Sequence, residues 1–159
     1  MTTLHTTRFG QIEVPDDRII EMPEGILGFA QERRFVLLEH DSEGTPFKWL
    51  QAADNPNLAF IVMDPHLVVA DYQVEFDKEA QRILGPQPDR ADLAVMAIVN
   101  IPHDRPIEMT VNLRAPVVVH CEKRLGCQLV LPNEDYPIRH RLFPDPAGEG
   151  AGAAQAPKP

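Results

Sequence analysis

The chain has 159 residues, of which 43% are hydrophobic, and it carries a formal net charge of −9 at pH 7. This length suffices for one domain with a real core, and no apolar run approaches the ~20 residues of a membrane-spanning helix. The acidic balance promotes solubility and favours basic partners, and it argues against direct nucleic-acid binding, because phosphate contacts require clustered Lys and Arg. The N-terminus lacks the basic start and apolar run of a signal peptide, which predicts a cytoplasmic protein without membrane contact.

The N-terminal segment predicts a β-hairpin followed by a short strand. Apolar and polar residues alternate within Leu4–Val14, and Phe9 and Gly10 are suited to the hairpin turn. Ile19–Met22 is predicted to form a strand, which Pro23 ends because proline lacks the backbone N–H that a sheet requires.

The next segment, PEGILGF at 23–29, combines turn-forming glycines with apolar side chains. Gly25 and Gly28 lie within four residues and favour a tight turn. We expect this turn to pack three apolar side chains onto the sheet, namely Ile26, Leu27 and Phe29.

Five further strands are predicted between residues 35 and 101, and the sixteen prolines of the chain favour such short elements over long helices. Ala59–Met63 contains no polar residue, which predicts a strand buried on both faces. Tyr72–Phe76 alternates between apolar and polar residues, which predicts a strand with one buried face. The remaining predicted strands are Phe35–Leu38, Phe47–Gln51 and Leu93–Ile101.

One α-helix is predicted over Lys78–Leu84, where most residues have high helix propensity. Asp77 is suited to cap its first turn with a side-chain oxygen. Gly85 and Pro86 are expected to end the helix.

The clearest periodicity lies in Ile107–Leu131. The odd positions from 107 to 121 are apolar and most even positions are polar, which predicts a strand with one buried face. Fully extended, that run would span about 50 Å, more than the ~37 Å diameter of a domain of this size, so we expect a bend or break at Ala115-Pro116. A turn over Glu122–Gly126, with Gly126 in the left-handed conformation, then predicts an antiparallel partner strand.

The C-terminal part of the chain changes character after Phe143. Asn133–Phe143 is a mixed polar segment that we expect to pack along an edge of the sheet. The residues from Pro144 onward are rich in Pro, Gly and Ala and cannot bury enough surface to offset their ordering entropy. We therefore predict a single domain over 1–143 and a disordered tail over 144–159. The expected fold is mainly β, a small antiparallel β-barrel-like domain with one or two short helices.

No pattern of residues predicts catalysis. The single serine, Ser42, does not lie in a nucleophile elbow, and the six histidines show no metal-binding spacing. His120 and Cys121 are adjacent in a predicted strand and should face opposite sides, which disfavours a catalytic pair. Cys121 and Cys127 are expected to be free buried thiols. We therefore predict a protein that is not an enzyme and binds no cofactor and no metal.

Three aspartates leave an alternative open. Asp54, Asp64 and Asp71 could gather into a metal or acid/base site. Two of them lie beside proline or in an Asn-Pro turn, however, where aspartate is favoured for turn geometry alone. A structural role is therefore the preferred interpretation of these residues.

Four segments, in order and without large gaps, resemble the FliW family of flagellar assembly factors. The resemblance spans Leu4 to Phe143, and its segments are PEGILGF at 23–29, PFKWLQAADNPNLAFIVMDP at 46–65, MTVNLRAPVVV at 109–119 and YPIRHRLF at 136–143. It implies a β-barrel-like fold without catalysis and two protein partners. These are the carbon storage regulator CsrA, an RNA-binding translational repressor, and flagellin. Binding of CsrA would relieve repression of flagellin translation, and unassembled flagellin would compete for the factor.

Partner contacts are predicted from motif position and from the alternation of polar residues. Asp64, Asp71, Glu108 and Asn112 are expected on solvent-facing turns or strand positions, within a face that also includes Thr110 and Arg114. Phe29 and Tyr136 are candidate apolar anchors. Core packing of the two aromatic residues, and a turn or edge hydrogen bond for Asn112, are the structural alternatives. An alternative function is a β-scaffold domain that binds another basic or extended protein.

Overall fold

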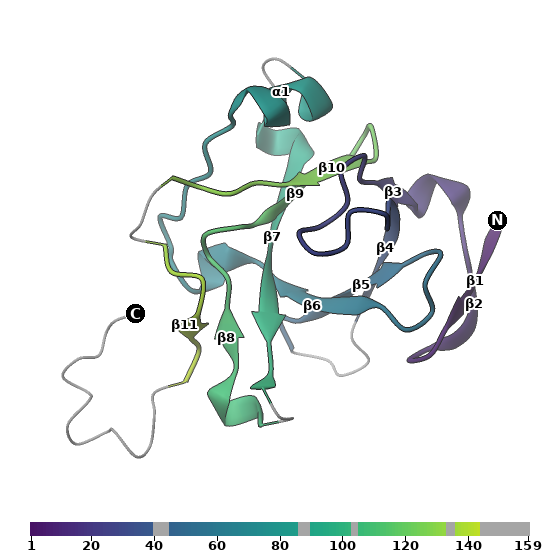
Figure 1. The fold of residues 1–159 in the computed structure, drawn as a ribbon, viewed down its shortest axis with the longest axis horizontal. Coiled ribbons are helices and arrows are strands. Elements are labelled where there is room, and N and C mark those ends of the chain that lie inside the picture. Colours follow the sequence, from purple (N-terminus) through teal and green to yellow (C-terminus); the bar gives the residue numbers. More distant parts are fainter. Residues whose placement is uncertain (40–44, 86–89, 103–104, 133–135, 144–159) are drawn as a thin grey trace.

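The computed structural model describes residues 1–39, 45–85, 90–102, 105–132 and 136–143. Within these residues, seven strands close into a barrel, and a hairpin and one α-helix pack on its outside (Figure 1). The mainly β, barrel-like fold expected from the sequence is therefore confirmed. The tail predicted over 144–159 lies outside the described residues. No helix in the described ranges combines the length and the apolar character needed to cross a membrane.

The barrel strands follow one another in space in an order that differs from their order in the chain. β9 closes the barrel by pairing with β7, where His120 lies opposite Leu93. All neighbouring strands are antiparallel except β3 and β10, which are parallel. The spatial order is β7 (Leu93–Asn100), β6 (Ala59–Met63), β5 (Lys48–Ala52), β4 (Arg34–Glu39), β3 (Ile20–Glu21), β10 (Leu125–Gln128) and β9 (Val117–His120).

Four short strands and the helix complete the described elements, together with four 3₁₀ turns. β1 (Thr2–Thr6) and β2 (Gly10–Val14) form the predicted N-terminal hairpin. β8 (Thr110–Val111) pairs with β7, and β11 (His140–Arg141) pairs with β8, so the predicted edge packing of the C-terminal segment is confirmed for its described residues. The 3₁₀ turns are Asp16–Arg18, Pro65–Leu67, Arg90–Asp92 and Pro106–Glu108.

The long periodic segment breaks because β7 has two partners along its length. β9 pairs with the first half of β7, and β8 pairs with Val99 and Asn100 at its far end. Residues 112–116 leave the sheet between them, so the break predicted at Ala115-Pro116 is confirmed and begins three residues earlier. The start of the segment differs from the prediction, because Ile107 is 45% exposed and lies in a 3₁₀ turn.

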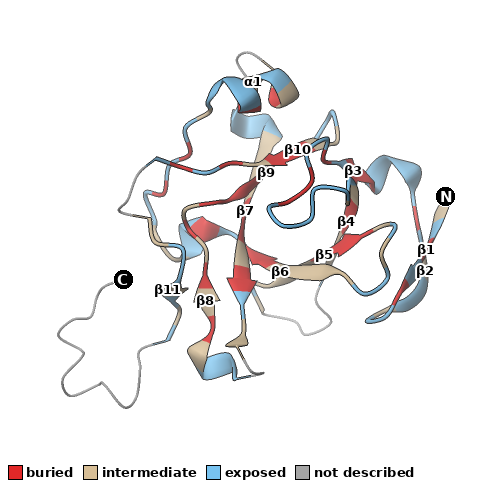
Figure 2. Cartoon of the chain, in the orientation of Figure 1, coloured by how far each residue is buried: buried red, intermediate tan, exposed pale blue. Residues whose placement is uncertain are grey.

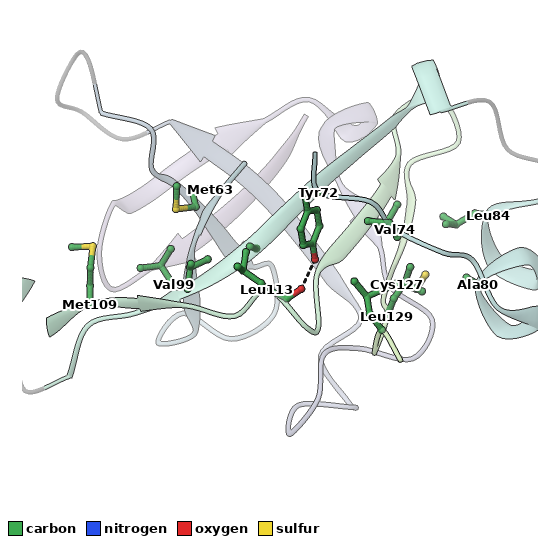
Figure 3. Close-up of a cluster of buried hydrophobic side chains, with 14 residues drawn as sticks. Met63, Tyr72, Val74, Ala80, Leu84, Val99, Met109, Leu113, Cys127 and Leu129 are labelled. Atoms are coloured by element: carbon green, nitrogen blue, oxygen red, sulfur yellow. Dashed lines mark hydrogen bonds between the residues drawn. The ribbon is translucent and has the colours of Figure 1, made fainter. Parts of the chain in front are cut away.

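The barrel wall is packed on both sides. Ten buried residues from the barrel strands and the loop at 22–26 fill the interior, Phe35 and Leu50 among them. Figure 2 shows buried residues along β9 and β10. A second cluster lies outside the wall, where Tyr72, Val74 and Leu84 pack against residues of these strands (Figure 3). β9 is therefore buried on both faces. The alternation predicted for its end is reversed, since His120 is buried and Cys121 is exposed.

The helix α1 (Lys78–Leu84) begins and ends where the sequence predicts. An oxygen of Asp77 accepts a hydrogen bond from the backbone N–H of Ala80 at 2.9 Å. Gly85 follows with φ of 110°, a conformation that favours glycine. Ala80 and Leu84 lie on one face of the helix and are both 1% exposed, so this face belongs to the outer cluster.

Two predictions about turns are wrong. The left-handed residue of the β9–β10 turn is Arg124, with φ of 55°, and Gly126 lies within β10. Gly126 is needed for space instead, because a Cβ there would lie 3.0 Å from Met22 Sδ and 3.1 Å from Val119 Cγ2. In the 23–29 segment only Ile26 is inserted into the core, whereas Leu27 is 64% exposed.

Two predicted strands also need correction. Tyr72–Phe76 keeps its alternation, with Tyr72 and Val74 buried, but it pairs with no strand in the described part of the chain. Ala59–Met63 is a barrel strand, yet only Val62 and Met63 are fully buried. Its other three residues are half-buried, because the wall is not covered on the outside along its whole length.

Candidate protein-binding surface

The described residues Asp71 and Tyr136, both predicted as partner contacts, line one surface hollow of about 280 Å³. Gln73, Glu75, Leu131 and Pro132 complete its lining. The backbone N–H of Gln73 donates a hydrogen bond to Tyr136 Oη at 3.1 Å. The structure therefore brings together two predicted residues that are 65 positions apart, and it adds Gln73 and Glu75, which the sequence shows only as ordinary outward-facing positions.

Tyr72 anchors the extended segment that carries this hollow. Its hydroxyl donates a hydrogen bond to the backbone oxygen of Leu113, and its ring centroid lies 4.6 Å from that of Tyr136 (Figure 3). Burial raises the pKa of Tyr72, and the neighbouring Tyr136 raises it further. The hydroxyl therefore stays protonated at neutral pH and can remain the donor in this bond.

Asp64 lies apart from this hollow and has a structural role. One of its oxygens accepts a hydrogen bond from the backbone N–H of His66 at 2.9 Å and lies 2.9 Å from His66 Nδ1. It caps the 3₁₀ turn Pro65–Leu67. Asp64 lines a different hollow, of about 440 Å³, together with Lys48 and Arg90. Asp64 therefore has the structural role in a turn that the sequence favours. Its carboxylate and that of Asp71 line different hollows and do not form a common site.

Asn112 and Glu108 hold the backbone around β8. Asn112 Oδ1 accepts hydrogen bonds from the backbone N–H groups of Arg114 and Ala115, at 3.0 and 3.1 Å. Glu108 forms an ion pair with Arg105 at 3.1 Å. Glu108, Asn112 and their two polar neighbours in the predicted face, Thr110 and Arg114, are all half-buried. The solvent-facing strand expected from 108 to 114 is therefore largely covered.

Phe29 combines core packing with exposure. Its ring meets that of Phe60 edge-on, with centroids 5.5 Å apart, and the residue is 38% exposed. Leu27 lies in the same loop and is more exposed. The loop thus presents two apolar side chains while Ile26 fills the barrel end. The sequence pattern does not identify Leu27 as exposed, because Ile26 and Leu27 are both large apolar residues and the sequence does not show which of them is buried.

The remaining candidate groups do not gather into a reactive centre in the described ranges. Asp54 forms two hydrogen bonds with the Arg34 guanidinium, at 2.7 and 3.1 Å, which hold the pKa of this carboxyl below its usual value. Burial raises the pKa of Cys127 to about 12, and neither Cys127 nor Cys121 forms a disulfide. No set of three or more His, Cys, Asp or Glu residues among the described positions is arranged to hold a metal ion.

Comparison with known proteins gives close matches over nearly the whole chain. The family model described as FliW protein matches residues 3–142. A flagellar assembly factor FliW from Caldanaerobacter subterraneus subsp. tengcongensis is 39% identical over 140 residues, which cover 88% of this chain and 92% of the relative. The flagellar assembly factor FliW from Syntrophus aciditrophicus is 41% identical over 141 residues, covering 88% and 87%. A crystal structure of the flagellar assembly factor FliW matches with a TM-score of 0.79 and 33% identity, covering 91% of this chain and 99% of the other.

The fold and the surface define a small β-barrel protein with hollows on its surface. The match over residues 3–142 and the relatives above also identify the protein family. This chain belongs to the FliW family of flagellar assembly factors, and the resemblance seen in the sequence is confirmed.

Proposed function

We propose that this protein is a cytoplasmic, non-enzymatic antagonist that binds the translational regulator CsrA and flagellin. The observation that carries the proposal is the family match over residues 3–142, a range that includes the segments around Trp49 and Asn112 on which the resemblance rests. Binding of CsrA relieves repression of flagellin translation. Free flagellin competes for the protein, so unassembled flagellin limits its own synthesis by mass action.

The charge of the chain supports a basic partner. A net charge of −9 attracts an RNA-binding protein, whose surface must be basic enough to hold phosphates. Of the six predicted contact residues, Asp71 and Tyr136 line the 280 Å³ hollow, and Phe29 is 38% exposed. Asp64, Glu108 and Asn112 already have structural partners, so we place them at the margin of the interface at most.

The test uses the purified full chain with CsrA and flagellin from the same genome. We expect a complex with each protein in size-exclusion chromatography, and we expect added flagellin to displace CsrA. In a second measurement, the chain should release CsrA from the leader RNA of the flagellin message. If neither CsrA nor flagellin forms a complex with the chain, the proposal is refuted. The β-scaffold function, with a different basic or extended partner, would then remain.

A charge variant tests the electrostatic part of this proposal. Replacing Asp71 by Lys should weaken CsrA binding by about fivefold or more, because it replaces attraction by repulsion at an exposed position. Asp17→Lys is the matched comparison, since it makes the same charge reversal at an exposed carboxylate in the 3₁₀ turn at 16–18, outside the predicted contacts. Unchanged affinity of both variants, at unchanged stability, would remove Asp71 from the interface.

A further inference from the structure

Among the described residues, the extended segment from Gln73 to Phe76 has one backbone edge that is occupied and one that is only partly occupied. In an extended chain, the N–H and C=O groups of alternate residues point to opposite edges. On one edge, the oxygen of Val74 accepts a hydrogen bond from Arg90 at 3.0 Å, and the oxygen of Phe76 accepts one from Gln81 at 3.1 Å. That edge is therefore covered by the chain itself.

The other edge carries the backbone groups of Gln73 and Glu75. The N–H of Gln73 donates a hydrogen bond to Tyr136 Oη. Among the described residues, the backbone oxygen of Gln73 and the backbone N–H and oxygen of Glu75 have no hydrogen-bond partner. Gln73 and Glu75 are exposed, and both line the 280 Å³ hollow beside Tyr136. Unpaired backbone groups in an extended, exposed segment are a template for another strand.

The segment is rigid enough to serve as such a template. Tyr72 and Val74 are each 3% exposed and pack into the outer cluster, and the Tyr72 hydroxyl is bonded to Leu113 (Figure 3). The helix α1 begins directly after the segment and holds its far end. Because the segment is already ordered, an added strand does not have to overcome the entropy of ordering it.

The charges on the partly occupied side select the occupant. Asp71 and Glu75 both line the hollow, at the two ends of the stretch 71–75. Neither carboxylate has an ion-pair partner within the described ranges. Their separation of four residues corresponds to at most about 13 Å of extended chain. A strand added alongside would match them with basic side chains about four residues apart.

We propose that the edge formed by Gln73 and Glu75 receives an extended basic segment of a partner protein by strand addition. The backbone groups and the hollow beside Tyr136 form the site, and Asp71 and Glu75 select positive charge. This inference rests on the proposed function in treating the chain as a protein-binding module, and it specifies the chemistry of the segment that is bound.

The probe is the synthetic peptide TKVTVKT, acetylated and amidated, whose two lysines are four residues apart. In an ¹⁵N–¹H NMR titration of the full chain, we expect saturable shifts centred on the backbone amides of Gln73 and Glu75. The peptide TEVTVET should bind at least about tenfold more weakly, because its charges are reversed. Methylation of the central backbone nitrogens of the lysine peptide should also abolish binding, since it removes the donors of an added strand.

Variants of the chain complete the test. The double variant Asp71→Asn, Glu75→Gln should bind the lysine peptide about fivefold more weakly, because two exposed ion pairs are lost. Asp17→Asn removes an exposed carboxylate in the 3₁₀ turn at 16–18 and should leave binding unchanged. Equal affinity for the lysine and glutamate peptides, or full binding of the N-methylated peptide, would overturn the inference.

Competition separates this inference from the proposed function. If CsrA or flagellin binds the chain but the lysine peptide neither binds nor competes, strand addition at Gln73 and Glu75 is wrong and the proposed function stands. If the peptide binds at this edge as described while neither protein forms a complex, the inference stands and the proposed function fails.

Discussion

Gln51 shows how a single polar residue can organise a turn from inside the core. It is fully buried in β5, and its Nε2 lies 3.1–3.4 Å from four backbone oxygens. These oxygens belong to residues 52, 55, 56 and 58, so one side chain ties together the connection between β5 and β6. The amide nitrogen of Gln51 therefore stabilises this connection.

Replacing Gln51 by Leu should lower the free energy of unfolding by about 1–2 kcal/mol. The substitution keeps a similar side-chain volume but removes the buried Nε2 donor that four backbone oxygens share, and the loss of a buried donor is costly. Urea unfolding followed by Trp49 fluorescence would measure the change. Gln11→Leu, at an exposed position of β2, should change it by less than about 0.5 kcal/mol. Equal losses in the two variants would contradict this role for Gln51.

At the scale of elements, the segment between β8 and β9 determines how the barrel closes. β7 is eight residues long and pairs with β9 over its first half and with β8 at its end. The chain must leave the sheet between these pairings, and Asn112 supplies an acceptor for two backbone N–H groups at that point. The polar residue that looks like a binding position in the sequence is a turn residue in the fold.

This role predicts different effects for two substitutions of Asn112. Asn112→Ala should lower the free energy of unfolding by about 1–2 kcal/mol, because two N–H groups lose their acceptor. Asn112→Asp keeps a side-chain oxygen that can accept both hydrogen bonds and should retain most of the stability. Thermal unfolding of both variants checks this. A stable Asn112→Ala variant with weakened CsrA binding would instead make Asn112 a partner contact.

At the scale of the whole molecule, charge affects association more than folding. The net charge of −9 creates a long-range field that accelerates encounter with a basic protein. Added salt screens this field, because the Debye length falls from about 10 Å at 0.1 M to about 3 Å at 1 M.

The association rate with CsrA should therefore fall by about tenfold between 0.05 and 0.5 M NaCl, with little change in the dissociation rate. Stopped-flow fluorescence at several salt concentrations would measure both rates. The double variant Asp71→Asn, Glu75→Gln should show a shallower dependence if these carboxylates contribute to the field at the interface. An association rate that does not vary with salt would contradict electrostatic steering.

The candidate surface was predicted only in part. Asp71 and Tyr136 were identified as separate positions, and nothing local in the sequence places them in one hollow. Gln73 and Glu75 were placed on the outer side of a predicted strand, so the alternation was right. The partly occupied edge was not predictable, because an alternating pattern reports which face is buried and does not report whether a neighbouring strand is present.

The sequence by itself determined the features that depend on neighbouring residues. Asp77 caps α1, the N-terminal hairpin forms between its predicted strands, and the long periodic segment breaks near Pro116. Tertiary structure alone decided the parallel pairing of β3 with β10, the closure of β9 on β7 and the burial of His120. These features join residues that are far apart in the chain. Their stability depends on which side chains cover each face of the barrel wall, and a local sequence pattern does not contain that information.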